Sequence, residues 1–295
     1  MNNTIIVRFV GGLGNQLFQY SYYKWLEIQY PEKEILADLS EFEFDRPHDS
    51  AFFWEIFKDI NIKKANRIQL FKASGYIPKI YGGKGSWPLN KLRTMINSSL
   101  LEYKGLFLDI YHNQPEDTKR IVEDGITYLE GYWQNLFYYD FLQKKVGPFK
   151  FLIDKEIRYQ REIRESNAVA VHVRRGDYVG SEYEKDCGIE YYTAAIQYMM
   201  ENIENPHFFF FSDDPEYVRN TYNWLEKKTI VQDNIGQKSY YDMFLMSCCP
   251  NCILANSTFS IWAAYLNKNK NQIVVYPDVF FVKKMVKPEW VPISV

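Results

Sequence analysis

Residues 168–182, AVAVHVRRGDYVGSE, are the stretch from which the fold of this 295-residue chain follows. A β-branched run over residues 169–173 predicts a buried strand, which stops at two arginines, a glycine and an aspartate. Because side chains alternate between the faces of a strand, we expect His172 and Arg174 on one face and Arg175, with the valines, on the other. Open α/β sheets bind their ligands at the carboxyl ends of strands such as this one.

The two arginines make this strand end a candidate anion site. Arg174 and Arg175 carry permanent charges, and each guanidinium group presents its donors in a fixed fork that matches two phosphate oxygens. Two carboxylates, Asp177 and Glu182, follow within the same stretch. The alternative is a buried strand that ends in an ordinary surface loop with solvated charges.

The composition is that of an ordinary globular protein, with 46% hydrophobic and 24% charged residues. The length accommodates one large α/β domain or two domains of roughly 150 residues each. A net charge of −2 gives no general attraction to nucleic acid, so we expect no nucleic-acid partner. Aromatic residues make up 18% of the chain, and they either fill the core or stack on a carbohydrate ligand.

The N-terminus and the cysteines favour a reducing, cytoplasmic location. Residues 1–12 lack the basic region and long apolar run of a signal peptide, and no window reaches 18 uninterrupted apolar residues. Four cysteines are too few for a disulfide framework at this length. Cys249 and Cys252 have a C-x-x-C spacing without the second pair that a zinc site needs, so we expect no metal.

A glycine loop near the N-terminus separates a predicted buried strand, residues 4–10, from a predicted helix, residues 15–30. Such loops let backbone amides at a helix start approach an anion. The sequence GGLGNQ lacks the Lys-Ser/Thr pair of nucleoside-triphosphate loops and the third glycine of the dinucleotide fingerprint. A tight turn that binds no ligand is the alternative.

A second strand end with carboxylates follows Phe208–Phe211, which reads as a fully buried strand. We expect Asp214 to cap the next helix, with Pro215 at its first position. That capping role accounts for Asp214 and leaves Asp213 as a possible ligand.

A third strand end is predicted at residues 252–255. The next three residues, Asn256-Ser257-Thr258, start a helix that runs to about Leu266, and its terminal amides and hydroxyl groups form a second candidate phosphate site. A further helix, residues 239–247, carries one carboxylate, Asp242, among apolar residues.

The alternation of strands and helices predicts an α/β fold with two Rossmann-like, doubly wound domains. The best boundary lies within residues 140–165, so we divide the chain into domains at 1–155 and 156–295. The other predicted elements are strands at 34–38, 126–134 and 273–276 and helices at 154–165 and 191–202.

Three segments strongly resemble signature segments of the α-1,2-fucosyltransferases, glycosyltransferase family 11. They are GGLGNQLFQYSYYKWL at 11–26, HVRRGDYV at 172–179 and ANSTFSIWAAYL at 255–266. FSDDPEYV and YYDMFLMSCC fit between them in the family's order, whereas residues 40–125 are largely unmatched.

The resemblance implies a GT-B-like fold in which two domains face a cleft. The N-terminal domain would lie on the acceptor side, and the C-terminal domain would bind the donor substrate, GDP-fucose. It also implies inversion at the sugar carbon with no metal or other cofactor, and the chain contains no Asp-x-Asp of the metal-dependent GT-A enzymes. The charge of the leaving diphosphate is then met by arginine and by helix-terminal amides.

The family's binding residues carry over by position. Arg174 is expected to hold the β-phosphate and His172 to lie against the donor, unless His172 is a hydrogen-bonded core residue. Asp242 stands where related enzymes place a guanine-binding carboxylate, unless it caps or pairs internally. The other expected donor contacts are Gly14, Asn15, Asp213, Ser257, Thr258, Phe259 and Ser260.

Glu182 and Asp177 are the two candidates for the base that takes the proton of the acceptor hydroxyl. Related α-1,6-fucosyltransferases have a Gly-Thr-Glu base at the spacing of residues 180–182, which members of this family do not uniformly keep. Asp177 has the alternative role of holding Arg175 or the loop by hydrogen bonds.

The expected reaction moves L-fucose to the 2-OH of a terminal galactoside in an acceptor glycan. A lipid-linked acceptor would bring the protein to the membrane surface as a peripheral protein. The alternatives are a fucosyltransferase of different linkage or acceptor, an enzyme that uses another nucleotide sugar, and a sugar-binding module without turnover.

Overall fold

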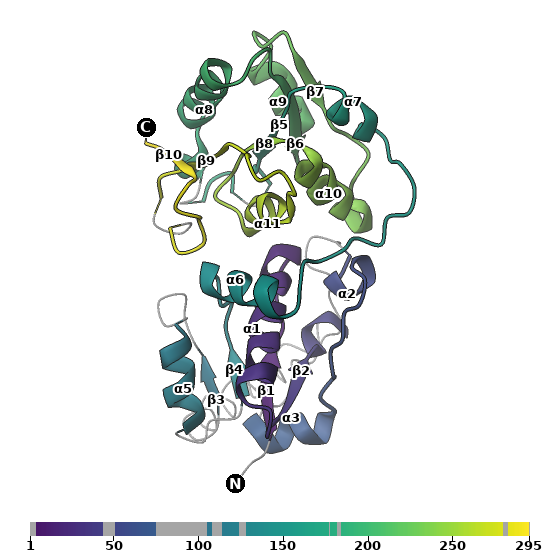
Figure 1. The fold of residues 1–295 in the computed structure, drawn as a ribbon, viewed down its shortest axis with the longest axis vertical. Helices are drawn as coiled ribbons and strands as arrows, with labels where there is room; N and C mark the ends of the chain where they lie inside the picture. Colours follow the sequence, from purple (N-terminus) through teal and green to yellow (C-terminus); the bar gives the residue numbers. More distant parts are fainter. Residues whose placement is uncertain are drawn as a thin grey trace. The chain divides into compact units, whose positions relative to one another are not determined.

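The computed structural model describes residues 4–43, 51–74, 105–107, 114–123, 128–176, 178–181, 184–279 and 283–294. The chain forms two compact units, one of residues 1–49 and 59–148 and one of residues 50–58 and 149–295. The division from sequence placed the boundary at residue 155 and kept residues 50–58 in the first domain. Figure 1 shows the elements of each unit.

The first unit is built on a parallel sheet in the order β2-β1-β4-β3. Its elements are β1 (Thr4–Arg8), α1 (Leu13–Gln29), β2 (Glu34–Asp38), η1 (Ser40–Glu43), α3 (Arg67–Ser74), β3 (Gly105–Phe107), α5 (Pro115–Glu123), β4 (Tyr128–Glu130) and α6 (Leu136–Lys145). Helix α1 is buried on most of its surface, and the Tyr22 ring stacks on Trp133 at 4.2 Å between centroids. The aromatic side chains of this unit therefore fill its core.

The second unit is built on a parallel sheet in the order β10-β9-β8-β5-β6-β7. Its elements are α2 (Phe53–Ile56), α7 (Gln160–Arg164), β5 (Ala168–Val173), η3 (Glu184–Cys187), α8 (Ile189–Asn202), β6 (His207–Ser212), α9 (Pro215–Thr221), β7 (Lys228–Ile230), η4 (Gly236–Lys238), α10 (Tyr240–Cys248), β8 (Asn251–Ile253), α11 (Thr258–Leu266), β9 (Val274–Pro277) and β10 (Val291–Ile293). From β5 the chain winds outward to β7 and then returns to start β8 on the other side of β5. This is the doubly wound order of a Rossmann fold, with its topological switch point between β5 and β8.

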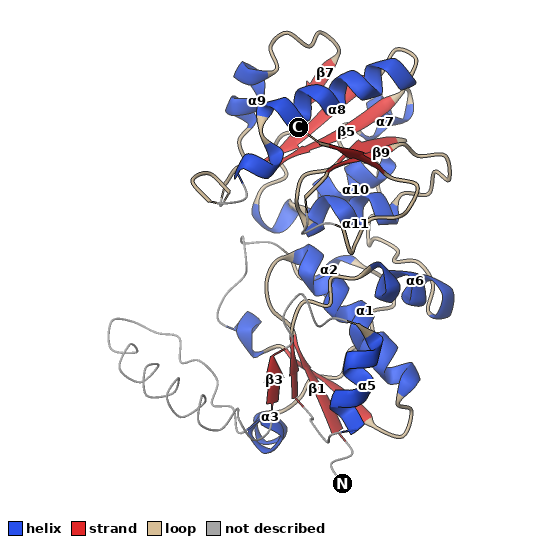
Figure 2. Ribbon diagram, turned by 90° about the vertical axis from the view of Figure 1, so that its left-hand side faces the viewer, coloured by secondary structure: helices blue, strands red, loops and turns tan. Residues whose placement is uncertain are grey.

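The faces of β5 alternate as the sequence predicts. Val169, Val171 and Val173 pack in one cluster with Tyr191 and Tyr192 of α8. The opposite face lies toward α11, and Figure 2 shows α8 on one side of the sheet and α10 and α11 on the other. The predicted α/β class, with parallel sheets covered by helices, is confirmed.

The helix predicted at 154–165 is wrong over its first half, because only Gln160–Arg164 is helical. Tyr159 precedes it with a φ of 70°, a left-handed conformation that ends any helix arriving from the N-terminal side. The three-residue strands β3, β7 and β10 were not predicted, because three residues carry little periodic signal. The equally short strands β4 and β8 were found only as parts of longer apolar segments.

The four cysteines are free thiols. Within the residues that the structure describes, no cluster of three or more His, Cys, Asp or Glu side chains is suited to hold a metal ion. In the same part of the chain, no helix is both long enough and apolar enough to cross a membrane.

Candidate functional site

The candidate site is assembled where β5, β6 and β8 end, around the switch point of the second sheet. Strand β5 is followed by Arg174, β6 by Asp213, and β8 leads to the cap of α11 at Ser257. Parallel strands bring their carboxyl ends to one edge, so these segments of distant sequence lie together.

Asp213 organises the turn after β5. Its Oδ1 accepts a hydrogen bond from the backbone N–H of Arg175 at 2.8 Å, and its Oδ2 accepts one from Gly176 at 3.1 Å. The same carboxylate pairs with Nη1 of Arg174 at 3.1 Å. A Cβ atom at Gly176 would lie 2.8 Å from Oδ2, so this approach needs glycine. Asp213, expected as a donor contact, is engaged in holding the arginine turn.

The two arginines lie apart, as strand alternation predicts. The Arg175 guanidinium lies 3.9 Å from the Tyr217 ring centroid, and its Nε is 3.7 Å from Asp214 at the start of α9. Arg174 lies 5.9 Å from the ring centroid of Tyr178 and keeps 22% of its side chain exposed. Arg175 therefore belongs to the packing of α9, and Arg174 is the arginine that remains near the strand ends.

Asp214 caps α9 as predicted. Its Oδ1 accepts a hydrogen bond from the N–H of Tyr217 at 3.0 Å, and Pro215 occupies the first turn. This arrangement satisfies one of the donors that every helix start leaves without a partner.

His172 is buried against α11, with its ring centroid 5.6 Å from that of Phe259. Burial and the nearby charge of Arg174 lower its pKa to about 4, so the imidazole is neutral at pH 7. Its Nδ1 is buried and meets no hydrogen-bond partner among the residues that the structure describes. The bond expected of a hydrogen-bonded core histidine is therefore not seen at Nδ1 within the described part of the chain.

The start of α11 is held by Ser257, whose Oγ accepts a hydrogen bond from the N–H of Phe259 at 3.3 Å. Ser260 is fully buried, and its Oγ lies 3.2 Å from the carbonyl oxygen of Ser257, to which it donates. Thr258 is half-buried, like Ser257. Of the four candidates here, Ser260 is buried inside the unit and Phe259 packs on His172. Ser257 and Thr258 are partly exposed to solvent.

Asp242 lies in the first turn of α10 and accepts a hydrogen bond from Nδ2 of Asn234 at 2.7 Å. Burial raises the pKa of this carboxyl group to about 7, and the bond from Asn234 opposes the shift. Asp242 therefore has an internal hydrogen-bond partner, which is the alternative to guanine binding that the sequence left open. Asp242 titrates near neutral pH.

Gly14 and Asn15 belong to the first unit, in the first turn of α1. Gly14 is buried, and Oδ1 of Asn15 accepts a hydrogen bond from Nε2 of Gln134 at 2.9 Å. The loop before them has Gly11 at a φ of 79°, and Nε2 of Gln16 donates to the Gly11 carbonyl at 2.9 Å. Side-chain amides thus hold this glycine loop.

Both candidates for the base, Asp177 and Glu182, lie outside the described residues. Tyr178 and Asn256 were missed by the sequence reasoning, although both belong to the motifs that it singled out. The hydroxyl group of Tyr178 donates to the carbonyl oxygen of Asn256 at 2.5 Å, which joins the arginine turn to the segment before α11.

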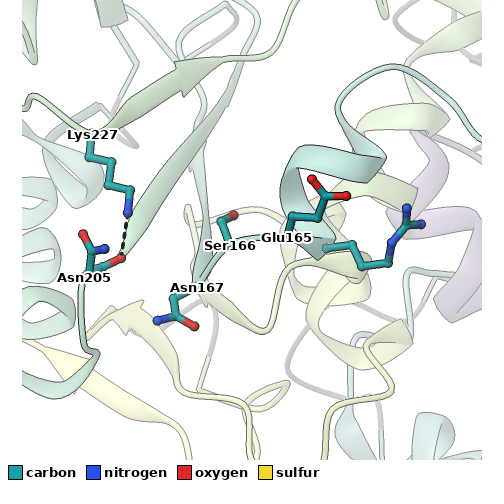
Figure 3. Close-up of a pocket in the computed structure, with 6 residues that line it drawn as sticks. Glu165, Ser166, Asn167, Asn205 and Lys227 are labelled. Carbon is teal, nitrogen blue, oxygen red and sulfur yellow. Dashed lines mark hydrogen bonds between the residues drawn. The ribbon is translucent and has the colours of Figure 1, made fainter.

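A pocket of about 370 Å³ lies at the opposite, amino edge of the same sheet (Figure 3). Its lining includes Asn167 before β5, Asn205 before β6 and Lys227 before β7. Nζ of Lys227 donates to the carbonyl oxygen of Asn205 at 3.2 Å, as drawn in Figure 3. The position at the amino ends of the strands separates this pocket from the candidate site.

Residues 90–294, more than half of the chain, match Glycosyl transferase family 11. The O-antigen biosynthesis glycosyltransferase WbnK of Escherichia coli is 27% identical over 95% of this chain and 97% of its own. An alpha-1,2-colitosyltransferase of Escherichia coli is 28% identical over 95% of this chain and 93% of its own.

A shorter similarity connects the chain to a mammalian protein. The galactoside 2-alpha-L-fucosyltransferase SEC1 of Bos taurus is 28% identical over 44% of this chain and 39% of its own. The family match covers the arginine turn, Asp213, Asp242 and the cap of α11. The chain is therefore a member of glycosyl transferase family 11.

Proposed function

We propose that this protein is an inverting fucosyltransferase that moves L-fucose from GDP-fucose to the 2-OH of a terminal galactoside. The observation that supports this proposal most is that Arg174 and the capped start of α11 follow neighbouring strands at the switch point of a Rossmann-type sheet, linked through Tyr178, in a member of this family. Such crevices at strand ends are where open α/β sheets bind nucleotides.

The proposed role of Arg174 is to meet the charge that develops on the leaving diphosphate. Asp213 holds its Nη1 at 3.1 Å and also holds the turn behind it, so the guanidinium is placed before the reaction. The amides at the start of α11 add the partial positive charge of a helix N-terminus. Positioned donors of this kind act without reorganising during the reaction.

Two buried groups complete the proposed donor site. The neutral ring of His172, whose Nδ1 has no partner among the described residues, would accept a hydrogen bond from the donor or give one to it. Asp242, as a carboxylate, would accept from the two adjacent N–H donors of guanine. Its pKa near 7 means that part of the population carries a proton at neutral pH.

The proposed chemistry is a direct displacement. The acceptor oxygen forms a bond to the anomeric carbon of fucose while the bond from that carbon to the β-phosphate oxygen breaks. The electron pair of the broken bond leaves with GDP, and the hydroxyl proton passes to a carboxylate. Asp177 and Glu182 are the proposed alternatives for that carboxylate, with a galactose-containing glycan as the acceptor.

One rival has an observation in its favour, namely the alignment of an alpha-1,2-colitosyltransferase with 95% of this chain. Colitose lacks the 3-hydroxyl group of fucose. A site that hydrogen-bonds that hydroxyl group discriminates strongly against a donor without it, whereas a site that does not will accept both. Competition between GDP-fucose and GDP-colitose therefore separates the two readings.

The decisive first experiment is calorimetric titration with GDP, UDP and ADP, first with a chelator and then with manganese. We expect selective binding of GDP that the chelator does not change. Binding of UDP in its place would remove fucose from the proposal. Absence of any nucleotide binding would make a sugar-binding module without turnover the better reading.

The second experiment is transfer from GDP-fucose to a terminal β-galactoside, with the linkage and anomeric configuration of the product determined by NMR. We expect an α-linked fucose on the 2-OH. Asp177→Asn and Glu182→Gln are then compared, and the variant that loses turnover but keeps its GDP affinity identifies the base. A product linked elsewhere on galactose would contradict the proposed acceptor specificity.

A further inference from the structure

A set of hydrogen bonds ties the segment after Arg174 to the residue before the cap of α11. The hydroxyl group of Tyr178 donates to the carbonyl oxygen of Asn256 at 2.5 Å. Nδ2 of Asn256 donates to Oδ2 of Asp186 at 2.7 Å, and its backbone N–H donates to Sγ of Cys187 at 3.1 Å. We call these four residues, Tyr178, Asp186, Cys187 and Asn256, the Asn256 latch.

Asn256 is the buried centre of the latch, and the other three residues are half-buried around it. Asn256 is 1% exposed, and three different groups of this one residue, its N–H, its carbonyl and its side-chain amide, hold three different residues. Burial raises the pKa of the Cys187 thiol to about 12, so it accepts the amide hydrogen bond as a neutral thiol. Releasing Asn256 would leave several buried polar groups without partners, which is costly.

Tyr178 is itself fixed in the arginine turn. Its N–H donates to the carbonyl oxygen of Arg175 at 2.8 Å, and its own carbonyl accepts from Oγ of Ser181 at 2.7 Å. The ring centroid lies 5.9 Å from the Arg174 guanidinium. The ring of this tyrosine thus lies near the guanidinium, and its hydroxyl group binds the segment before α11.

We propose that Tyr178 and Asn256 are positioning residues of the donor site, which set the distance between the Arg174 guanidinium and the start of α11. This inference rests on the proposed function, because those are the two groups assigned to the diphosphate. A diphosphate bound by both needs them at one spacing, and a displacement near 1 Å is enough to cost roughly 100-fold in rate. Neither residue contacts the donor in this proposal.

Tyr191 provides a matched control for Tyr178. Its hydroxyl group donates to the carbonyl oxygen of Leu254 at 2.6 Å, two residues before Asn256, and it is likewise removed by a Phe substitution. The ring of Tyr191 belongs to the core between β5 and α8 and not to the arginine turn. Tyr178→Phe and Tyr191→Phe therefore each lose one hydrogen bond to the same chain segment, but only Tyr178→Phe loosens the latch.

The test measures the Kd for GDP by calorimetry and the thermal midpoint of both variants and of the wild type. We expect both variants to lose thermal stability, and Tyr178→Phe alone to bind GDP about 10-fold more weakly. Unchanged GDP affinity in Tyr178→Phe, or an equal loss of affinity in Tyr191→Phe, would overturn the inference. If the wild type itself does not bind GDP, the proposed function fails before the latch is tested.

A second pair of variants addresses the other end of the latch. Asp186→Asn keeps an acceptor oxygen for Nδ2 of Asn256, whereas Asp186→Ala removes it. We expect GDP affinity close to that of the wild type in Asp186→Asn and about 10-fold weaker binding in Asp186→Ala. Equal affinities in the two variants would show that the contact with Asp186 does not position the site.

Discussion

Arg8 and Arg174 stand at equivalent places in the two units, at the end of the first strand of each sheet, in different surroundings. Arg8 is held from two sides, by Glu41 at 2.8 Å and by Glu130 at 2.7 Å. Arg174 pairs with Asp213 at 3.1 Å, and that carboxylate also accepts two backbone N–H groups. The side chain of Arg8 is 14% exposed, against 22% for Arg174.

The difference is one of charge balance. Arg8 and its two glutamates form a group of net charge −1, which repels an anion. Arg174 and Arg175 each pair with one carboxylate, Asp213 and Asp214, so these two pairs carry no net charge. An arginine at the same topological place therefore joins two glutamates in the first unit and forms part of a candidate anion site in the second.

Among the substitutions considered, Arg174→Ala is expected to have the largest effect, on the rate of fucose transfer. Loss of one positioned donor to a developing negative charge typically lowers the rate by about two to three orders of magnitude. Arg174→Lys should lose most of that rate as well, because a point charge does not replace the planar fork. Measured kcat/KM values for fucose transfer check both variants, and near-normal turnover in either would contradict the assignment.

Arg8→Ala is the matched control for this substitution and should show the opposite profile. Its two carboxylates lose their common partner, so we expect a loss of roughly 2 kcal/mol in stability with no change in GDP affinity. A weaker Kd for GDP in Arg8→Ala would mean that the two arginines do not differ as the charge balance indicates.

The second unit also contains two titratable groups with opposite effects on stability. The folded state lowers the pKa of His172 from 6.5 to about 4. The contribution of the neutral ring to the free energy of unfolding is therefore complete above pH 6.5 and is lost as the pH falls toward 4. The folded state raises the pKa of Asp242 from 3.8 to about 7. The contribution of the protonated carboxyl group to the free energy of unfolding is therefore complete below pH 4 and is lost as the pH rises through 7.

These two groups make a testable pH dependence. From the pKa shift of His172, we expect the free energy of unfolding to fall by about 3 kcal/mol between pH 6.5 and pH 4. His172→Gln should remove this loss. Asp242→Asn should remove the opposite slope, so the stability of the variant relative to that of the wild type rises between about pH 4 and pH 7. Urea midpoints at several pH values check both slopes, and parallel profiles for wild type and variants would show that neither group titrates as stated.

Gly176→Ala tests the hydrogen bonds that Asp213 accepts from the arginine turn. The added Cβ would lie 2.8 Å from Oδ2, so the carboxylate must move away from its two N–H donors. We expect a loss of about 1–2 kcal/mol in stability and weaker GDP binding. Gly188→Ala is the control, because its Cβ would meet the mobile end of Glu190 at 3.0 Å and should change neither quantity much.

The smallest effects are expected at two helix caps of the second unit. Asp214→Ala at α9 and Ser257→Ala at α11 each remove one capping hydrogen bond, worth about 1 kcal/mol. Only Ser257→Ala should also weaken GDP binding, by a few-fold, because α11 is the helix assigned to the diphosphate. Equal GDP affinity in the two variants would remove the start of α11 from the proposed site.

Much of the fold was predictable because its signals are local. The cap at Asp214 with Pro215, the start of α11 at Ser257 and the second strand at residues 34–38 are confirmed. Each depends on residues within about four positions, so capping and periodicity suffice to find it. The helix predicted at 154–165 is wrong in its first half because a left-handed Tyr159 is invisible to periodicity.

The candidate site was predictable only in part. The motifs pointed to His172 and Arg174, but they did not indicate that Asp213 would be engaged with the turn or that Ser260 would face the protein. The partners of Asp213 lie 37 and 38 positions away, and Tyr178 lies 78 positions from Asn256. No local pattern encodes which distant partner a polar side chain will meet.

By itself the sequence determined the α/β class, the alternation of faces along β5, the helix caps and the resemblance to family 11, because each of these is written in short-range patterns. The tertiary structure decided which arginine is held by two glutamates and which is paired with Asp213 at the switch point of the second sheet. It also decided that Asn256 joins the two parts of the candidate site. Those choices depend on the order of strands in the sheet, which brings residues of distant sequence to one edge.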